Sequence, residues 1–356
     1  MGAGTWIAAG RPVEAHDTLS IADHRGIVEY VPGDLTLTAR AGTRLSEIAA
    51  ATAAEGQWLP LDPWGGDAGT LGATLSTASA GPHAYAMGLP RDVALGVEFV
   101  GGSGQVVRAG GRVVKNVAGF DLTRMVIGSW GTLGVITEAT VRLRARPERT
   151  CTIAIVVAIS HGALNDLAAR LRALPFAPLA SELINARLAA HVGLGDDPVL
   201  VARVGGNEKA VNAQLEALRG LGDSRDADES IWHSLRTREP VGAASWRWSQ
   251  LPSLFGETWS AADRATRALG GGGALMHGNP ARGVVRIITS EAPKANAAEL
   301  TRAAAAFSGT VVIECLPANA WSLVATSPAQ DPVSRAIRAK FDPERLLNAG
   351  ILGGDA

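Results

Sequence analysis

Three clusters of small residues stand out among the 42 glycines of this 356-residue chain, at positions 2–5, 69–81 and 128–134. A ligand that carries a diphosphate needs several main-chain N–H donors within about 3 Å of its oxygens. Only residues with little or no side chain allow the backbone to come so close. The clusters therefore indicate a dinucleotide site, and the alternative is that each cluster only forms turns in a β-rich domain.

The spacing of the glycines excludes two common nucleotide-binding motifs. A Walker A loop, GxxxxGK[ST], is absent, and the candidate GxG at Gly102 and Gly104 has Val107 in the place of its third glycine. A nicotinamide-binding Rossmann unit also needs a strand, the glycine fingerprint, a helix and an acidic residue in that order, and this order is missing. A different glycine-rich framework must hold the ligand.

Composition narrows the class of protein further. The net charge of -1 gives no bulk attraction to nucleic acid or anionic lipid. The longest apolar run, residues 153–159, is far shorter than the roughly 20 residues of a membrane span. Cys151 and Cys315 form no metal-binding or redox pair, so we predict no metal site and two buried strand residues. The first ten residues lack a signal peptide, and we expect the protein in the cytoplasm.

The elements of the first 147 residues are short and mostly strands. Hydrophobic alternation predicts a strand at 35–41, a helix at 46–55, and a hairpin that pairs 97–100 with 106–108. The odd-numbered residues from 135 to 143 are mostly apolar and alternate with mostly polar even-numbered ones, which predicts a strand with one solvent-exposed face. The sequence Arg146-Pro147-Glu148 then marks a domain boundary.

After this boundary, strand and helix patterns alternate, which predicts a separate α+β domain. We expect a dinucleotide-binding domain at 1–147, a second domain at 148–325, and a C-terminal segment at 326–356, and the resemblance described below implies that this segment returns to the first domain. The expected strands are 152–159, 199–204, 284–289 and 310–314, and the expected helices are 164–174, 208–221, 293–306 and 332–340.

Several ordered segments carry a resemblance to a known family. They read DHRGIV at 23–28, LP and DP within 59–63, GTLG at 69–72, RD at 91–92, VKNVAGFDL at 114–122, GSWGTLGVITE at 128–138, FDP at 341–343 and LN at 347–348. In this order they resemble the FAD-binding subunits of glycolate oxidase, within the vanillyl-alcohol oxidase and p-cresol methylhydroxylase superfamily. The resemblance covers most of the first domain and the last 25 or so residues.

The resemblance implies an α+β fold, in which two α+β subdomains of the p-cresol methylhydroxylase type bind FAD noncovalently and an α+β cap domain follows. The family has a strand, a helix and a strand ahead of the loop that here begins at Gly2, so about thirty residues are expected to be missing. The implied cofactor-binding residues are Gly2, Ala3, Gly4, Thr5, Trp6, Pro63, Thr70, Leu71, Gly72, Ala73, Thr77, Ser79, Gly81, Gly131, Gly134, Val135, Ile136 and Asn348.

The same resemblance implies oxidation of glycolate or a similar 2-hydroxy acid. Such a substrate needs a cation for its carboxylate and a base for its hydroxyl. The candidates are His277 as base and Arg286 as clamp, with Lys115 and Asn116 in the segment most like the family. The alternatives are a solvated loop histidine, a capping lysine and a turn asparagine. His83 could also face the flavin ring.

The implied partners are a larger FAD subunit and an iron–sulfur subunit, because two cysteines are too few to hold a cluster. Electrons would then leave through these partners, which could also attach the chain to the inner membrane. Two alternatives stay open at this point. The chain could be a self-sufficient 2-hydroxy acid dehydrogenase, or a scaffold subunit without a working flavin.

Overall fold

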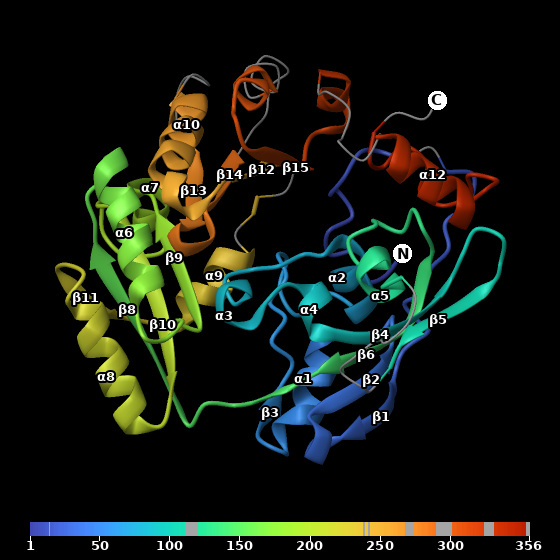
Figure 1. Cartoon of the computed structure of the whole chain (residues 1–356), viewed down its shortest axis with the longest axis horizontal. Coiled ribbons are helices and arrows are strands. Elements are labelled where there is room, and N and C mark those ends of the chain that lie inside the picture. Colours follow the sequence, from blue (N-terminus) through green and yellow to red (C-terminus); the bar gives the residue numbers. More distant parts are fainter. Residues whose placement is uncertain are drawn as a thin grey trace. The chain divides into compact units, whose positions relative to one another are not determined.

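The computed structural model describes the chain except residues 14, 112–119, 238, 241–242, 268–273, 290–300, 324–330 and 354–356. It divides into two compact units, coloured along the sequence in Figure 1. Unit 1 comprises residues 1–7, 11–146 and 326–356, and unit 2 comprises residues 8–10 and 147–325. Each unit has its own sheet, and the chain passes from the first to the second at Arg146 and Pro147.

Unit 1 contains a five-stranded antiparallel sheet in the order β1-β2-β6-β4-β5. The predicted strand at 35–41 is β2, and the predicted hairpin is β4 with β5, so both predictions are confirmed. The strands of unit 1 are β1 (Ile27–Val31), β2 (Thr36–Arg40), β4 (Ala94–Val100), β5 (Val106–Gly110) and β6 (Val135–Arg142), with the separate pair β3 (Gln57–Trp58) and β7 (Arg144–Ala145).

Short helices pack against this sheet and complete the core of unit 1. Leu37 of β2, Ile48 of α1, Leu75 of α2 and Phe99 of β4 are 1% exposed or less and belong to one cluster. The predicted helix at 46–55 is α1, which is confirmed. The helices are α1 (Leu45–Ala53), α2 (Leu71–Thr77), α3 (Ala84–Met87), α4 (Pro90–Val93), α5 (Leu122–Val126) and α12 (Pro332–Phe341).

The strand predicted at 135–143 exists as β6, but its expected alternation is wrong at the start. Ile136 is 3% exposed, whereas Val135 and Thr137 are only partly buried. The cause is a β-bulge, since β4 pairs Phe99 with Ile136 but Glu98 with Glu138, which leaves Thr137 without a partner opposite. A bulge inserts one extra residue and so moves the buried face by one position.

The C-terminal segment packs on the β4–β5 hairpin of unit 1. The ring of Phe341, at the end of α12, lies 6.0 Å from that of Phe99, and its carbonyl accepts a hydrogen bond of 2.9 Å from the Gly102 N–H. A Cβ at Gly102 would lie 2.1 Å from the carboxylate of Asp342, so glycine is required for this approach. The predicted helix at 332–340 is confirmed as α12.

Unit 2 contains an eight-stranded antiparallel sheet in the order β11-β8-β10-β9-β13-β14-β12-β15. All four strands predicted for this region are present, and the helix predicted at 293–306 lies largely outside the described residues. The strands are β8 (Arg149–Val156), β9 (Ala180–Ile184), β10 (Val199–Gly206), β11 (Ser224–Ala227), β12 (Ala244–Ser249), β13 (Leu275–Asn279), β14 (Val284–Thr289) and β15 (Thr310–Cys315).

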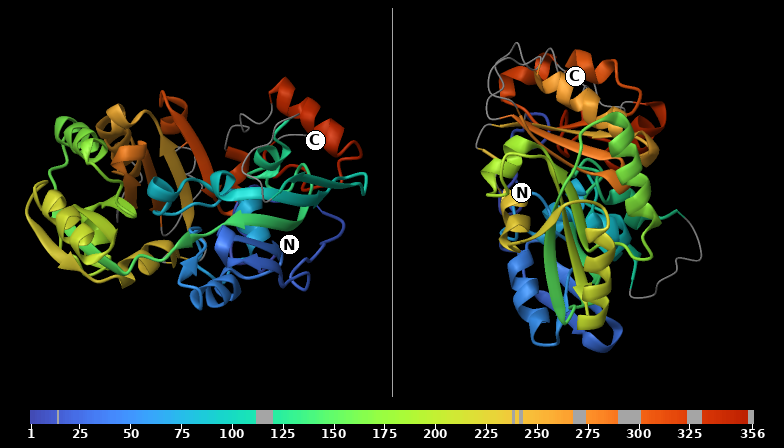
Figure 2. Two further views of the ribbon diagram at one scale, coloured as in Figure 1. Left: turned by 60° about the horizontal axis from the view of Figure 1, so that its bottom comes forward. Right: turned by 90° about the vertical axis from the view of Figure 1, so that its left-hand side faces the viewer.

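Helices cover both faces of this sheet. On one side, α8 packs on β8 and β10, and α10 packs on α6 and β14 (Figure 2). On the other side, α7 and α9 enclose an apolar cluster that includes Ile184, Val199 and Trp232. The helices are α6 (His161–Ala173), α7 (Ala186–His191), α8 (Glu208–Arg219), α9 (Ser230–Thr237) and α10 (Phe255–Arg267), so the predicted helices at 164–174 and 208–221 are confirmed.

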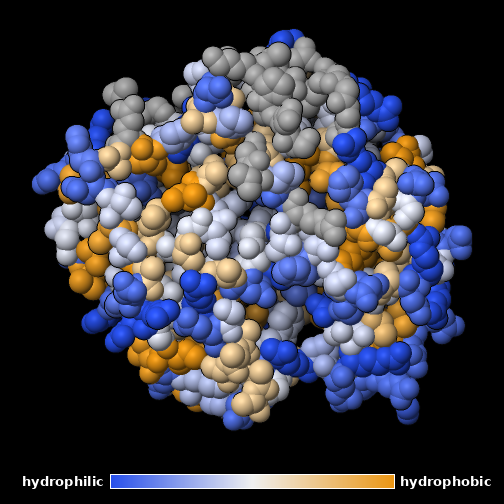
Figure 3. Space-filling model, turned by 180° about the vertical axis from the view of Figure 1, so that it is seen from behind, coloured by the Kyte–Doolittle hydropathy of each residue, from blue (hydrophilic) through white to orange (hydrophobic). Residues whose placement is uncertain are grey.

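The surface carries both hydrophobic and hydrophilic residues. In Figure 3, hydrophobic residues are scattered in small groups among hydrophilic ones. Among the helices of the described residues, none is both long and apolar enough to cross a membrane. Cys315 is 5% exposed, and burial raises the pKa of its thiol to about 12, so this strand residue stays protonated at neutral pH.

Close packing at Gly134 leads to a stability prediction. A Cβ at this position would lie 2.4 Å from the ring of Phe99 and 3.0 Å from the Val100 carbonyl oxygen. Gly134→Ala should therefore lower the free energy of unfolding by about 1–3 kcal/mol, as overpacked cores do. Urea denaturation measures this, with Gly33→Ala as the matched control because a Cβ there meets nothing within 4 Å. Equal stability of the two variants would contradict the packing argument.

Candidate functional site

A cavity of about 140 Å³ lies within unit 1, between the N-terminal loop and α2. Its lining includes residues from both of the first two glycine clusters and from the loop at 63–64. The predicted cofactor-binding residues that line it are Gly2, Gly4, Thr5, Trp6, Pro63, Ala73, Thr77 and Ser79. The structure thus brings together residues that are more than seventy positions apart in the sequence.

The wall made by residues 69–81 is a helix rather than an open loop. Thr70 caps α2, because its Oγ1 accepts a hydrogen bond of 3.3 Å from the Ala73 N–H. Ala78 ends the helix in the left-handed conformation, with φ of 49°. Leu71 is fully buried in the core of unit 1, so its side chain cannot reach a ligand.

At most glycines of the predicted site, neighbouring atoms of the protein leave no room for a side chain. A Cβ at Gly2 would lie 2.5 Å from Thr70 Oγ1, one at Gly72 would lie 2.6 Å from the Ala41 Cβ, and one at Gly81 would lie 2.2 Å from the Asp62 carbonyl oxygen. The structure gives these positions a packing role, and their contacts with a cofactor stay predictions. Gly4, with φ of +73° and nothing within 4 Å, keeps an open side toward the cavity.

The third cluster joins the C-terminal segment. Trp130 has a left-handed backbone, with φ of 56°, which its two hydrogen bonds hold in place. Its N–H donates to the Ser76 carbonyl at 2.9 Å, and its carbonyl accepts from Asn348 Nδ2 at 2.7 Å. Asn348 therefore binds the protein beside Gly131. Ile136 lies in the core, which leaves only its backbone available to a cofactor.

Trp6 carries the clearest sign of a missing ligand in this cavity. Its ring packs against Trp130 with centroids 5.7 Å apart, and its Nε1–H is buried with no hydrogen-bond partner among the described residues. A buried N–H donor normally has an acceptor. An anionic oxygen of a diphosphate in the cavity would supply one, so the residues present fit a dinucleotide.

The sequence analysis named His83 but not its partner in unit 1, Asp62. The Asp62 carboxylate accepts a hydrogen bond of 2.9 Å from the His83 N–H, and it lies 3.3 Å from His83 Nδ1. Both residues are less than 10% exposed, and the ring of Trp58 meets the imidazole edge-on at 5.0 Å. The absent side chain of Gly81 is what admits Asp62.

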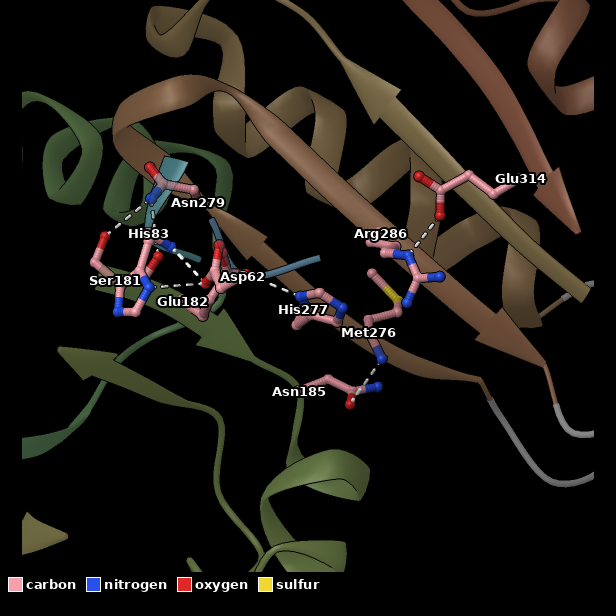
Figure 4. Close-up of polar contacts among 10 residues, drawn as sticks. All are labelled: Asp62, His83, Ser181, Glu182, Asn185, Met276, His277, Asn279, Arg286 and Glu314. Carbon is pink, nitrogen blue, oxygen red and sulfur yellow. Dashed lines mark hydrogen bonds and ion pairs between the residues drawn. The ribbon is translucent and has the colours of Figure 1, made fainter. Parts of the chain in front are cut away.

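In unit 2, one face of the sheet carries a row of ionisable side chains on neighbouring strands. His277 of β13 pairs with Arg286 of β14, which pairs with Arg247 of β12, and directly paired residues in antiparallel strands point to the same side. His277 is 1% exposed, so the alternative of a solvated loop histidine is wrong. Its Nδ1 lies 2.9 Å from Glu182 Oε2, a contact drawn in Figure 4.

Arg286 is bound to two carboxylates. Its Nε donates to Glu314 at 2.6 Å and its Nη2 to Glu239 at 2.8 Å, and its side chain is only 3% exposed. Burial alone raises the pKa of Glu314, but the guanidinium groups of Arg286 and Arg247 lower it by more, so its pKa lies below the ordinary value. The two glutamates take two of the five N–H donors of Arg286, and its role as a clamp for a substrate carboxylate stays a prediction.

Two predicted catalytic residues fall in the segment 112–119, which the structure does not describe. Lys115 and Asn116 lie outside the described residues, and their predicted roles stay predictions. No group of three or more His, Cys, Asp or Glu side chains that could hold a metal occurs among the residues that the structure describes. Glu182, Glu239 and Glu314 were also missed by the sequence reasoning, because no local motif marks them.

Comparisons with known proteins agree with the fold and with the predicted cofactor. Residues 1–110 match the family described as FAD binding domain. The solved structure of alkyldihydroxyacetonephosphate synthase superposes with a TM-score of 0.67 at 16% identity and covers 98% of this chain and 71% of its own. Residues 1–110 are thus part of an FAD-binding domain, and FAD is the cofactor, as predicted.

The sequence comparison finds two similar glycolate oxidase subunits. The chain is 35% identical over 250 residues to glycolate oxidase subunit GlcE of Escherichia coli, which covers 68% of this chain and 65% of that protein. It is 35% identical over 153 residues to glycolate oxidase subunit GlcD of Bacillus subtilis, with 43% and 33% covered. The chain therefore spans less than two thirds of either relative. The predicted resemblance to glycolate oxidase subunits is confirmed, and the fold is that of the p-cresol methylhydroxylase-type FAD-binding proteins.

The unpartnered indole of Trp6 gives a binding prediction. Trp6→Phe keeps the ring packing but removes the donor, so FAD should bind about tenfold more weakly, which is about 1.4 kcal/mol. Flavin fluorescence titration of the apoprotein measures this affinity. Trp248→Phe is the matched control, because its buried Nε1–H also has no partner among the described residues but lies in unit 2. If both variants bind FAD like the wild type, Trp6 does not contact the cofactor.

The Arg286 network gives a stability prediction with a pH dependence. Arg286→Met should cost about 3–5 kcal/mol at neutral pH, because Glu314 and Glu239 lose their counter-charge in a buried place. In the wild type, the lowered pKa of Glu314 contributes stability above the ordinary glutamate pKa, and this contribution is lost as the pH falls through the lowered value. In the variant, burial should raise that pKa, so acidification should recover part of the loss.

Urea denaturation at pH 5 and pH 8 tests whether acidification recovers part of the stability that Arg286→Met loses. The control is Arg203→Met, whose ion pair with Glu229 at 2.7 Å is partly exposed and should contribute at most about 1 kcal/mol. A loss for Arg286→Met that is no larger than the control, or that grows on acidification, would show that the network is not a buried charge pair.

Proposed function

We propose that the chain is the FAD-binding subunit of a complex that oxidises glycolate or a similar 2-hydroxy acid. The observation that carries this proposal is the similarity to GlcE over 250 residues. This length exceeds the 110 residues that match the FAD-binding domain, so the similarity extends beyond cofactor binding alone. D-Lactate dehydrogenase of Archaeoglobus fulgidus, 30% identical over 193 residues, supports the same substrate class.

The chemistry divides between cofactor and protein. FAD supplies the acceptor for the electron pair that leaves the substrate, and the protein must bind, orient and deprotonate the 2-hydroxy acid. In unit 2, His277 is the candidate base. Its contact with Glu182 holds Nδ1 and fixes the orientation of the ring, which leaves Nε2 as the nitrogen that could take a proton.

The charges around His277 argue against a self-sufficient enzyme. Arg286 and Arg247 stand against Glu182, Glu239 and Glu314, so two positive and three negative groups leave a formal charge of -1 before the histidine is counted. A substrate carboxylate entering this region would meet net repulsion, and the buried arginine is already doubly bound. A subunit that acts together with partners fits this balance better.

The partners in this proposal are a larger FAD subunit and an iron–sulfur subunit. The chain has only Cys151 and Cys315, which cannot hold a cluster. Electrons would therefore leave through another chain. The same proposal places the chain in the cytoplasm, attached to the inner membrane through these partners. Fractionation of cells that express the whole complex would test this location.

A steady-state assay tests whether the chain needs its partners to oxidise the substrate. The isolated, FAD-loaded chain should reduce an artificial dye with glycolate about a hundredfold more slowly than the assembled complex, the effect expected when one positioned catalytic group is missing. His277→Gln is compared with His191→Gln, an exposed histidine on α7. Fast turnover by the isolated chain, lost only in His277→Gln, would favour the self-sufficient dehydrogenase. A chain that binds no FAD would favour the scaffold.

A further inference from the structure

The N-terminal segment is divided between the two units within its first eleven residues. Residues 1–7 belong to unit 1, residues 8–10 belong to unit 2, and the chain returns to unit 1 at Arg11. Residues 1, 2 and 4–7 line the cofactor cavity of unit 1. We call residues 8–10 the strap. The strap is thus the direct continuation of the loop that is predicted to bind the FAD diphosphate.

The strap is bonded to β15, the last strand in the sheet order of unit 2. Ala9 forms an antiparallel bridge with Cys315, whose other neighbour is Ser245 of β12. The Gly10 N–H donates to the carbonyl oxygen of Glu314 at 2.8 Å. Ala9 is 7% exposed and Cys315 is 5% exposed, so the bridge is buried. The strap therefore supplies a partner for the outer edge of the sheet at this point.

The end of β15 that the strap binds also carries part of the buried charge network. The carboxylate of Glu314 accepts from Arg286 Nε at 2.6 Å, as Figure 4 shows, and lies 3.9 Å from Arg247 Nε. Arg286 lies opposite His277, the candidate base, in the pairing of β14 with β13. The strap is therefore bonded to the backbone of a residue whose side chain holds this network together.

The chain between the cofactor cavity and the strap is short. Three residues separate Trp6, which lines the cavity, from Ala9, which forms the bridge, and three residues of extended chain span at most about 11 Å. A turn in which the Ile7 N–H donates to the Gly4 carbonyl oxygen at 3.3 Å takes up part of this length. A ligand that fixes the loop at 2–6 therefore also restricts the position of the strap.

We propose that the strap couples occupancy of the cofactor cavity to the order of β15 and, through Glu314, to the charge network of unit 2. A diphosphate that holds the loop at 2–6 favours the state in which the strap is bonded to β15. Coupling of this kind is reciprocal, so a change that releases the strap weakens FAD binding by the same factor. The inference rests on the cofactor site predicted in this cavity, and it goes beyond the proposed reaction because it needs no substrate.

Hydrogen exchange of the full-length chain, followed by mass spectrometry, tests the coupling. Saturating FAD should slow exchange about tenfold in the strap and in residues 310–315, because opening of the bridge becomes rarer. Exchange in β10 of the same unit should change less than about twofold. ADP carries the diphosphate without the flavin, so at saturation it should slow exchange in the same two segments.

Gly10→Pro tests whether the strap carries the effect. Gly10 has φ of +79°, which proline cannot adopt, and proline also lacks the N–H that bonds to Glu314. FAD should bind about tenfold more weakly to this variant and should no longer slow exchange at 310–315. Gly104→Pro is the matched control, since Gly104 has φ of +77°, donates to the Gly101 carbonyl oxygen at 2.9 Å and does not line the cavity. Its FAD affinity should stay within about twofold of the wild type.

Four results would each overturn the coupling while leaving the proposed function intact, because FAD binds in all of them. FAD could slow exchange in β10 as much as at 310–315, or could slow 310–315 equally in Gly10→Pro. FAD could act where ADP does not, which would assign the effect to the flavin. The two proline variants could also lose FAD affinity equally. The wild-type measurements do not depend on the folding of either variant, and a chain that binds neither FAD nor ADP would overturn both proposals.

Discussion

The flavin domain depends on the close approach of backbone segments at a few glycines. At Gly72, Gly81 and Gly134, a single added carbon would come within 2.6 Å of a neighbouring atom. These contacts hold α2 against the end of β2, the loop at 62 against the loop at 81, and the start of β6 against β4. Because the same segments form the walls of the cavity or support them, packing of the protein fixes the shape of the cofactor site before any ligand contact is made.

Unit 2 depends on a different constraint, the pairing of buried charges. A guanidinium group out of water must keep its counter-ions, and Arg286 keeps two. Glu182 holds His277 in the same way, although by a single contact. The pair of Glu182 and His277 links the neighbouring strands β9 and β13, and the pair of Arg286 and Glu314 links β14 to β15 across β12, which lies between them. Any catalytic role for the histidine has to be compatible with this structural role.

The fold was predictable where local periodicity decides it, and the site was less so. β2, β14 and α8 follow from hydrophobic patterns within one element. The alternation of β6 failed at Ile136, because the bulge opposite Glu98 and Phe99 depends on a partner strand that is distant in sequence. The partners of His277 and His83 were missed for the same reason, since Glu182 is 95 positions from the first and Asp62 is 21 positions from the second.

The three glycine clusters predicted a dinucleotide site, and the resemblance to a known family predicted FAD, which the family match supports. The sequence did not show that the protein's own packing leaves no room for a side chain at Gly2, Gly72, Gly81 and Gly134. Gly4 and the Trp6 N–H are the groups left over after packing is satisfied. The core cluster of unit 1, against which the walls of this cavity pack, and the core cluster of unit 2 are separate sets of residues.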